Sequence, residues 1–222
     1  ITFGTSVTYP YYVLQSKLRI LREHGVSACP GGTLFEVAWM QGKYDAFLDR
    51  LQELGFTSIE ISDGTYPLSI KERQEAITKA KARKLEVLSE VGKKDPKENP
   101  EAAFLFDTLR ADLDYGSDFV IVEGRESGKG VGIYDAKGDI KQDDLEVLAQ
   151  DTSLLDRIIW EAPNKAQQVA LIKRFGANVN LGNIPVEEII ALEALRTGLR
   201  GDTLKDVVKK FVPQRYHYIQ VL

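Results

Sequence analysis

The chain has 222 residues, of which 43% are hydrophobic and 28% charged, and its formal net charge is −4. This composition is that of an ordinary globular protein, and the net charge gives no overall attraction to nucleic acid or to an anionic membrane. A single cysteine, Cys29, excludes an internal disulfide and fits a reducing cytosol. No apolar run approaches the ~18 residues of a membrane span, and no signal-peptide pattern opens the chain. We therefore expect a cytoplasmic protein that binds any anionic substrate through a local group of lysine and arginine side chains.

The first half of the chain alternates predicted strands with predicted helices. Short apolar runs rich in β-branched residues predict buried strands, and apolar residues three and four apart predict helices. Strands are expected at 1–3, 26–29, 57–62 and 85–91, and helices at 10–24, 34–40, 44–54 and 70–84. Ser69 and Glu72 have the spacing of a capping box, which predicts where the last of these helices begins.

The second half continues the same alternation. Strands are expected at 120–122, 157–161 and 178–181, helices at 101–115, 143–149, 165–175 and 186–197, and a turn or small hairpin at 134–138. No linker, low-complexity tract or composition break divides the chain. We therefore predict one catalytic domain over 1–203 and a C-terminal extension over 204–222.

The strict alternation of strand and helix predicts a parallel sheet with right-handed crossovers. An open doubly wound sheet would concentrate its functional strand ends at one switch point, whereas a closed (β/α)8 TIM-type barrel gathers all of them around one mouth. Nearly all of the seven predicted strands end in polar or charged residues, which favours the barrel. The first strand and helix of such a barrel would precede Ile1, and the tail over 216–221 is an alternative source of the eighth strand.

The loop after the predicted strand at 120–122 is densely charged. Glu123 is followed by Arg125, Glu126 and Lys129, and glycines at 124, 128 and 130 let the backbone turn sharply and approach a ligand. A surface loop with solvated charges is one interpretation. A carboxylate directly at the end of a buried strand favours another, an anion site in which Arg125 and Lys129 bind phosphate-like oxygens beside a metal-binding carboxylate.

Glutamates lie near the carboxyl ends of four successive predicted strands, at Glu60, Glu90, Glu123 and Glu161. Like charges that are brought close together raise one another's pKa and destabilise a fold unless a cation or a basic partner lies between them. A hard divalent ion with oxygen ligands, Mg²⁺ above all, would fill that role, and Asp63 is a further candidate ligand. Ion pairs with neighbouring lysine and arginine side chains are the alternative.

Basic residues are predicted at the same mouth, namely Lys93, Lys94, Arg125, Lys129 and, from a later loop, Arg200. Gly182 and Asn183 precede the last predicted helix, where barrels often bind phosphate through backbone N–H groups and the helix dipole. The glycines at 31 and 32 could act in the same way. Carboxylates, cations and helix N-termini together indicate a small, multiply anionic substrate that binds with a metal.

With these residues in place, the sequence resembles the phosphosulfolactate synthase family. Matching strings run in order along nearly the whole chain: Phe3–Ser6, Pro30–Glu36, Ile59–Thr65, Ser89–Lys94, Glu123–Gly130, Trp160–Pro163, Val179–Ile184 and Leu199–Thr203. The family normally has a further strand and helix before the position of Ile1, with an Asp-Lys-Gly motif and a lysine ahead of the Gly-Thr-Ser string. The tail after Thr203 is not part of the shared pattern.

The resemblance implies a variant (β/α)8 barrel enzyme, a carbon–sulfur lyase that adds sulfite to phosphoenolpyruvate with Mg²⁺ and forms (2R)-phospho-3-sulfolactate. That product lies on the route to coenzyme M in methanogens, and bacterial relatives are linked to sulfolactate formation. The family tends to form homotrimers, so a homo-oligomer is expected. Two alternatives stay open, namely another metal-dependent barrel lyase acting on an enolpyruvyl or phosphorylated acid, and a non-catalytic relative.

The roles that this reaction implies fall on the residues at the predicted mouth. The expected metal ligands are Glu90, Glu123, Glu161 and Asp63. The anionic groups of the substrate are expected at Arg125, Ser127, Lys129, Gly182, Asn183 and Arg200. Lys93, Lys94 and Glu60 form the expected catalytic group. Lys93 is the first candidate for the acid that protonates C2, its pKa lowered by cationic neighbours and partial burial, and Lys94 is the second.

Overall fold

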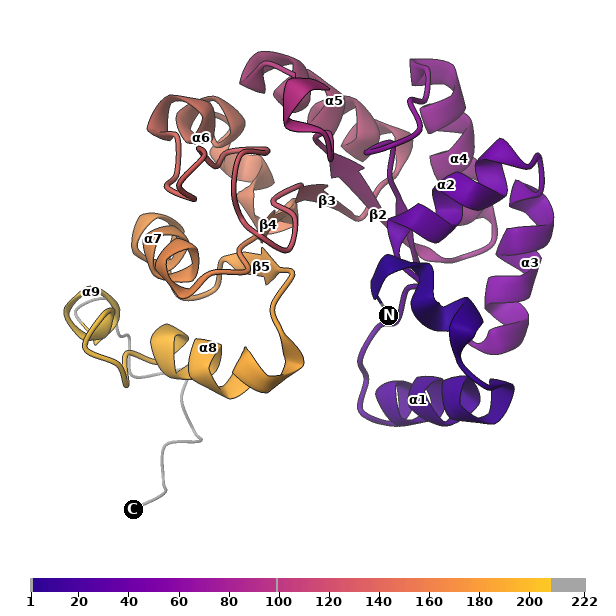
Figure 1. Ribbon diagram of the computed structural model, residues 1–222, viewed down its shortest axis with the longest axis horizontal. Helices are drawn as coiled ribbons and strands as arrows, with labels where there is room; N and C mark the ends of the chain where they lie inside the picture. The colour runs from indigo at the N-terminus through magenta and orange to yellow at the C-terminus, as the bar shows by residue number, and fades with distance from the viewer. Residues whose placement is uncertain (1, 99, 209–222) are drawn as a thin grey trace.

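The protein has an α/β fold built around one parallel sheet, shown in Figure 1. A computed structural model describes residues 2–98 and 100–208. The strands pair in the order of the sequence, each parallel to the next: β1 (Ser58–Ile61), β2 (Glu86–Val91), β3 (Phe119–Val122), β4 (Ile158–Glu161) and β5 (Asn180–Gly182). All five lie where the sequence predicts a strand.

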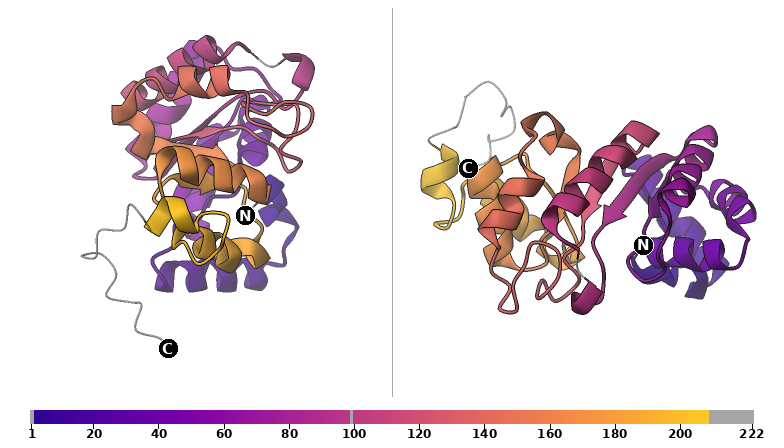
Figure 2. Two further views of the ribbon diagram at one scale, coloured as in Figure 1. Left: turned by 90° about the vertical axis from the view of Figure 1, so that its left-hand side faces the viewer. Right: turned by 90° about the horizontal axis from the view of Figure 1, so that it is seen from above.

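Helices connect successive strands and lie along the outer side of the sheet (Figures 1 and 2). They are α1 (Tyr11–Glu23), α2 (Gly32–Met40), α3 (Tyr44–Leu54), α4 (Ile70–Ala82), α5 (Ala102–Tyr115), α6 (Gln142–Leu148), α7 (Lys165–Phe175), α8 (Ile189–Arg196) and α9 (Leu204–Val208). Short 3-10 helices occur at η1 (Thr2–Thr8), η2 (Pro96–Glu98), η3 (Thr152–Arg157) and η4 (Val186–Glu188). The alternation that the sequence predicts from 57 onward is therefore confirmed.

Local sequence signals explain where several helices begin and end. The predicted capping box is present at α4, because Ser69 accepts the N–H of Glu72 while the Glu72 carboxylate accepts the N–H of Ser69. Helices α3 and α5 end at Gly55 and Gly116, whose φ angles of 90° and 114° lie in the region that favours glycine. The predicted hairpin is a single antiparallel bridge between Tyr134 and Ile140.

Side chains alternate between two faces of the sheet, as strand geometry requires. On β1, Ile59 and Ile61 are fully buried within the core that includes α1, α3 and α4, and Glu60 lies between them on the opposite face. The parallel register aligns Glu60 with Leu88 and Glu90 with Ile121. One face of the sheet is therefore apolar and covered by helices, while the other, inner face collects glutamates at the carboxyl ends of the strands.

Two apolar clusters hold the helices on the outer face. One surrounds β1 and the start of β2 and includes Phe35 and Leu48, and the other surrounds β3 and β4 and includes Leu109 and Trp160. Each of these four side chains is almost completely buried. Burial of one such side chain contributes about 1.5–3 kcal/mol. Apolar packing on the outer face of the sheet therefore holds the strands that carry the inner-face glutamates.

Two predicted strands are wrong. The expected strand at 1–3 is replaced from Thr2 onward by η1, in which Gly4 has a φ of 68° and a Cβ placed there would lie 3.1 Å from the Cβ of Leu34. The expected strand at 26–29 lies beside β1 but forms no ladder with it. The carbonyl of Ala28 accepts the N–H groups of both Thr57 and Ser58, each at 3.1 Å, and Ser27 Oγ donates to the Glu86 carboxylate at 2.6 Å, so the segment meets the sheet through separate hydrogen bonds rather than a ladder.

Closure of the barrel is not seen within residues 2–98 and 100–208, where β1 and β5 form the two edges of the sheet. The helices follow an arc around the strands in Figure 1, an arrangement consistent with a TIM-type barrel. An eighth strand before Ile1 stays a prediction, and the proposed tail strand at 216–221 lies outside the described residues. Among the helices of the described residues, none is long and apolar enough to span a membrane.

Candidate active site

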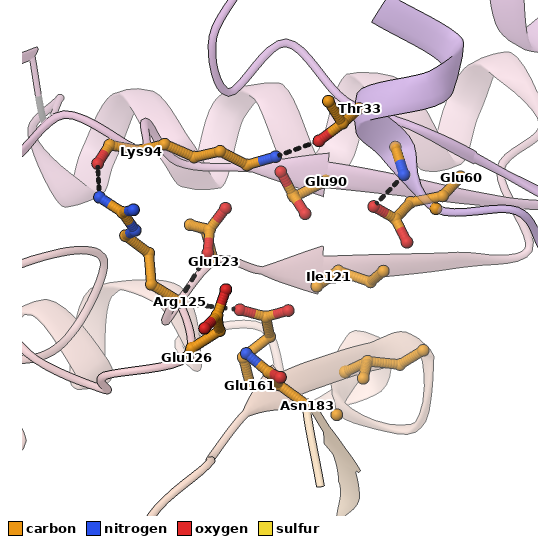
Figure 3. A pocket seen from close by; sticks show the side chains of 14 residues that line it. Thr33, Glu60, Glu90, Lys94, Ile121, Glu123, Arg125, Glu126, Glu161 and Asn183 are labelled. Carbon is orange, nitrogen blue, oxygen red and sulfur yellow. Dashed lines mark hydrogen bonds between the residues drawn. The ribbon is translucent and has the colours of Figure 1, made fainter. Parts of the chain in front are cut away.

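A pocket of about 280 Å³ opens on the inner face of the sheet, at the carboxyl ends of the strands (Figure 3). Its charged lining consists of Glu60, Glu90, Lys94, Glu123, Arg125, Glu126 and Glu161. Ile121 and Ile159 add apolar surface, and the remaining lining residues are Gly31, Gly32, Thr33, Gly182 and Asn183. The structure thus brings together the four predicted glutamates, one of the three predicted lysines and the predicted arginine of the β3 loop.

Burial raises the pKa of the four pocket glutamates. The pKa of Glu90, which is 3% exposed, rises to about 8 through burial and then through the charge of Glu123. Burial raises the pKa of Glu60 and of Glu123 to about 7, with Glu90 and Glu161 as the next causes respectively. Burial and the charge of Glu90 also raise the pKa of Glu161. Glu60, Glu90 and Glu123 are therefore partly protonated at neutral pH unless a positive charge joins them.

Backbone N–H groups hold several of these carboxylates. Glu60 Oε1 accepts the N–H of Gly32 at 2.7 Å. Glu161 Oε2 accepts the N–H groups of Gly124 at 2.8 Å and of Arg125 at 3.0 Å, and Glu123 Oε1 accepts the same Arg125 N–H at 2.7 Å. In contrast, Glu123 Oε2 is buried and has no hydrogen-bond partner among the described residues. A buried oxygen without a partner is costly, and the hydrogen bonds of the Glu123 carboxyl to those of Glu90 and Glu161 need a proton shared between the carboxyls.

Ser62 lies between two buried carboxyls. Its Oγ is 2.7 Å from Glu90 Oε1 and 2.9 Å from Glu36 Oε1, and it accepts the N–H of Gly64 at 3.2 Å. A hydroxyl has one proton, so it can donate to only one of the two carboxyls. The hydrogen bond that Ser62 donates to Glu90 lowers the pKa of Glu90 and so opposes the rise that burial and Glu123 cause.

Lys94 extends across the pocket from the loop after β2 (Figure 3). Its Nζ donates to Thr33 Oγ1 at 3.3 Å and lies 4.0 Å from Glu36 Oε1. Burial alone lowers the pKa of Lys94, but the carboxylates around it, Glu90 and Glu123 first, hold the pKa above its ordinary value of 10.5. The lowered pKa that we expected for an acid lysine is therefore not found at Lys94, because its neighbours are carboxylates rather than cations.

Lys93 and Asp63 lie outside the pocket lining. Lys93 Nζ donates to the carbonyl of Asp63 and, at 2.8 Å, to its carboxylate. The same carboxylate lies 3.2 Å from Arg73, whose guanidinium also forms a buried ion pair with Asp112 at 2.6 Å and donates to the Glu90 carbonyl. Asp63 is therefore already engaged by two cations, which separates it from the glutamates predicted to bind metal.

The loop after β3 brings one of its predicted anion-binding residues to the pocket. Arg125, with a φ of 57°, lines the pocket and donates from Nη1 to the Lys94 carbonyl at 2.8 Å. Ser127 and Lys129 are exposed and do not line it. The Ser127 carbonyl instead accepts from the Asn164 side chain at 2.9 Å, which ties this part of the loop to the start of α7.

The end of β5 supplies the far side of the pocket. Gly182 and Asn183 line it as predicted, and Asn183 has a φ of 56°, a conformation that asparagine tolerates. Arg200 does not line the pocket, and its Nε lies 3.6 Å from the carboxylate of Asp202. Because Lys165 also binds Asp202, at 2.6 Å, this group forms a separate surface ion-pair cluster.

The pocket matches a hard divalent cation in the kind of ligand it offers. Carboxylate oxygens are what Mg²⁺ prefers, and Glu90, Glu123 and Glu161 all line the cavity. Their raised pKa values and the unpartnered Glu123 oxygen indicate missing positive charge. Within residues 2–98 and 100–208, no group of three or more His, Cys, Asp or Glu side chains already has a metal-binding arrangement. These side chains would therefore need to rearrange around an ion.

Sequence reasoning missed two residues that lie behind the pocket, Glu36 and Ser62. Glu36 belongs to the apolar run at 34–40, where a single acidic residue is typical of an exposed helix position, yet it is only 4% exposed. Ser62 follows β1 and is fully buried. The only signal was that Glu36 interrupts an otherwise apolar helix.

Comparison with known proteins gives consistent matches. The family model described as (2R)-phospho-3-sulfolactate synthase (ComA) matches residues 1–202, a range that includes every residue lining the pocket. The chain is 46% identical to a phosphosulfolactate synthase of Methanocaldococcus jannaschii over 207 residues, 92% of this chain and 82% of the relative. Identity is 44% over 207 residues (92% and 80%) to that of Methanothermobacter thermautotrophicus. It is 38% over 205 residues (91% and 81%) to that of Bacillus subtilis.

Proposed function

Because the chain belongs to the (2R)-phospho-3-sulfolactate synthase family, we propose that it is a phosphosulfolactate synthase that adds sulfite to C3 of phosphoenolpyruvate. The observation that carries this proposal is the pocket at the carboxyl ends of the strands, where Lys94 and Arg125 lie beside the buried Glu90 and Glu123 and the half-buried Glu161. Both reactants are small anions, and a basic side chain beside a carboxylate-bound cation is the arrangement that they require.

In the proposed reaction, the sulfur lone pair of sulfite forms a bond to C3 while the C2–C3 double bond breaks. The electron pair of that double bond moves into the carboxylate as an enolate. Protonation of C2 then completes the addition, and the phosphate ester bond is not broken. The step therefore has no leaving group, and its barrier depends on enolate charge and on proton delivery.

Lys94 is the acid in this proposal. Its ammonium lies at the pocket, and neighbouring carboxylates raise its pKa, so it carries a proton at neutral pH. The Lys94 ammonium would protonate C2, and hydrogensulfite or water would return a proton to the amine. Lys93, the first candidate from the sequence, is bound by Asp63 outside the lining, which makes it the weaker choice.

The remaining charged residues would orient the reactants. Arg125 would face an anionic group of phosphoenolpyruvate or sulfite, since guanidinium groups bind such oxygens in pairs. Glu90, Glu123 and Glu161 would hold Mg²⁺, which when bound supplies positive charge opposite a developing enolate. Gly182 and Asn183 would contribute the far wall of the site.

The test measures loss of phosphoenolpyruvate by the purified protein with and without sulfite and Mg²⁺, and identifies the product by mass spectrometry. We expect turnover only when both are present, with a product mass equal to the sum of phosphoenolpyruvate and hydrogensulfite. Turnover without sulfite would indicate a different lyase. No turnover under any condition by the full-length protein would indicate a non-catalytic relative.

A further inference from the structure

Glu36 is a buried carboxylate that faces the back of the pocket rather than its interior. It lies on α2, is 4% exposed, and binds the turn that follows β1. Its Oε2 accepts the N–H of Tyr66 at 2.7 Å and that of Thr65 at 3.2 Å, while Ser62 Oγ lies 2.9 Å from its Oε1. One side chain of α2 therefore fixes the turn over residues 62–66.

That turn supports Lys94 along its length. The N–H of Lys94 donates to the carbonyl of Gly64 at 3.1 Å. A Cβ added to Gly64 would lie 3.0 Å from Lys94 Cε and 3.2 Å from Lys94 Cγ, so the aliphatic part of the lysine crosses directly over this glycine. The aliphatic part of the Lys94 side chain therefore packs against the turn that Glu36 holds in place.

The ammonium of Lys94 ends beside the same helix. Its Nζ donates to Thr33 Oγ1 at 3.3 Å and lies 4.0 Å from Glu36 Oε1. The side chain of Glu36 is 5% exposed and that of Lys94 28% exposed, so water and salt screen this attraction only weakly. Thr33 is at the exposed start of α2 and offers a neutral acceptor alone. Glu36 is the charged residue of α2 that attracts the Lys94 ammonium, beside the stronger effects of Glu90 and Glu123.

From these contacts we propose that Glu36 is a positioning residue, which acts through Lys94 by fixing both the turn beneath it and the place of its ammonium at the pocket. The proposal rests on the proposed function, in which Lys94 is the acid. A purely structural role, in which Glu36 only anchors the turn, is the competing explanation. The two differ in whether the negative charge of Glu36 matters.

Glu36→Gln separates the two explanations. The amide oxygen of glutamine can accept from Thr65 and Tyr66, and its NH₂ group can donate to Ser62 Oγ, so the turn keeps its anchor while the charge is lost. We expect kcat to fall by about ten- to a hundredfold, as a displaced catalytic group does, with the KM for phosphoenolpyruvate within about twofold and the unfolding midpoint nearly unchanged. Glu53→Gln, an exposed carboxylate change on α3, is the matched control and should leave kcat unchanged.

A second measurement, the reactivity of the Lys94 amine toward acetylation, tests whether Glu36 holds Lys94 and does not depend on turnover. The protein is acetylated with limiting N-hydroxysuccinimide acetate, and mass spectrometry compares Lys94 with the exposed Lys71. We expect the Lys94-to-Lys71 labelling ratio to rise severalfold in Glu36→Gln and to stay at the wild-type value in Glu53→Gln. If wild-type protein showed no sulfite-dependent turnover, the proposed function would fail while this ratio still decided whether Glu36 holds Lys94.

An unchanged labelling ratio in Glu36→Gln would overturn the proposal whatever happened to kcat, because Lys94 would then be held without the charge. A raised ratio with wild-type kcat would overturn it as well, since the position of the lysine would not limit the reaction. Support therefore requires both the raised ratio and the lowered kcat, in a variant that unfolds at the wild-type midpoint.

Discussion

Replacing Glu90 by glutamine tests whether the pocket carboxyls destabilise the fold when they ionise. Glu90 is 3% exposed, and its pKa is raised from 4.5 to about 8, first by burial and then by Glu123. Glutamine has nearly the same shape, carries no charge, and can still hydrogen-bond to Ser62 Oγ, which lies 2.7 Å from Glu90 Oε1. The substitution therefore removes the ionisation and leaves the packing nearly unchanged.

The raised pKa fixes both the sign and the size of the effect. The folded protein binds the proton of Glu90 more tightly than the unfolded chain does, so protonation stabilises the fold. This contribution is complete below pH 4.5 and is lost as the pH rises toward 8. At about 1.4 kcal/mol per pKa unit, and with proton sharing among neighbours, metal-free wild-type protein should lose roughly 3 kcal/mol over this range. Glu90→Gln should recover most of that loss, which corresponds to on the order of 10 °C in Tm.

The assay is thermal and urea unfolding of EDTA-treated protein between pH 5 and pH 8. The two proteins should unfold alike near pH 5 and diverge as the pH rises, with Glu90→Gln the more stable. Glu126→Gln is the control, because Glu126 lines the same pocket but is exposed. Added Mg²⁺ should stabilise wild-type protein at pH 8 and Glu90→Gln much less. Parallel unfolding curves for wild type and Glu90→Gln across this range would refute the reasoning.

Two further pairs of substitutions address the lysine assignment and the buried ion pair. Lys94→Ala should lower kcat by about 10²–10⁴-fold, as loss of a general acid does, whereas Lys93→Ala should lower it by less than about tenfold; steady-state consumption of phosphoenolpyruvate measures both, and the opposite order would return the acid role to Lys93. Asp112→Asn should reduce the free energy of unfolding by about 3 kcal/mol, because Arg73 would keep a buried charge. Urea unfolding at pH 7 measures this, and Asp49→Asn, in an exposed pair, should cost less than about 1 kcal/mol. Equal losses for the two aspartates would contradict the burial argument.

The strands could be predicted where a buried apolar run also has a neighbouring strand in register. The run at 120–122 became β3, and both Val120 and Val122 are buried among the outer helices. The runs at 1–3 and 26–29 failed because an apolar run indicates burial but not the presence of a neighbour in register. Ala28 meets β1 at a single carbonyl, and a sequence pattern contains no information on that geometry.

The glutamates of the site could be predicted because parallel strands present their carboxyl ends at one edge of a sheet. The sequence could not predict that Lys94 lines the pocket and Lys93 does not. Adjacent residues point in different directions, and Gly92, with a φ of 121°, turns the chain just before them. The engagement of Asp63 depends on Arg73, which reaches it from another element. Contacts of this kind follow from packing between distant segments, which no local spacing reveals.

Charge balance connects the stability of this protein to its proposed chemistry. Five carboxylates line the pocket, those of Glu60, Glu90, Glu123, Glu126 and Glu161, and only two cationic side chains of the described residues join them. If all were ionised, the lining would carry three net negative charges and would repel both phosphoenolpyruvate and sulfite. Raised pKa values show that protons offset part of this charge in the free protein. A bound anion needs a stronger offset, and in the proposed reaction a divalent cation that displaces those protons would provide it while the ammonium of Lys94 acts as the acid.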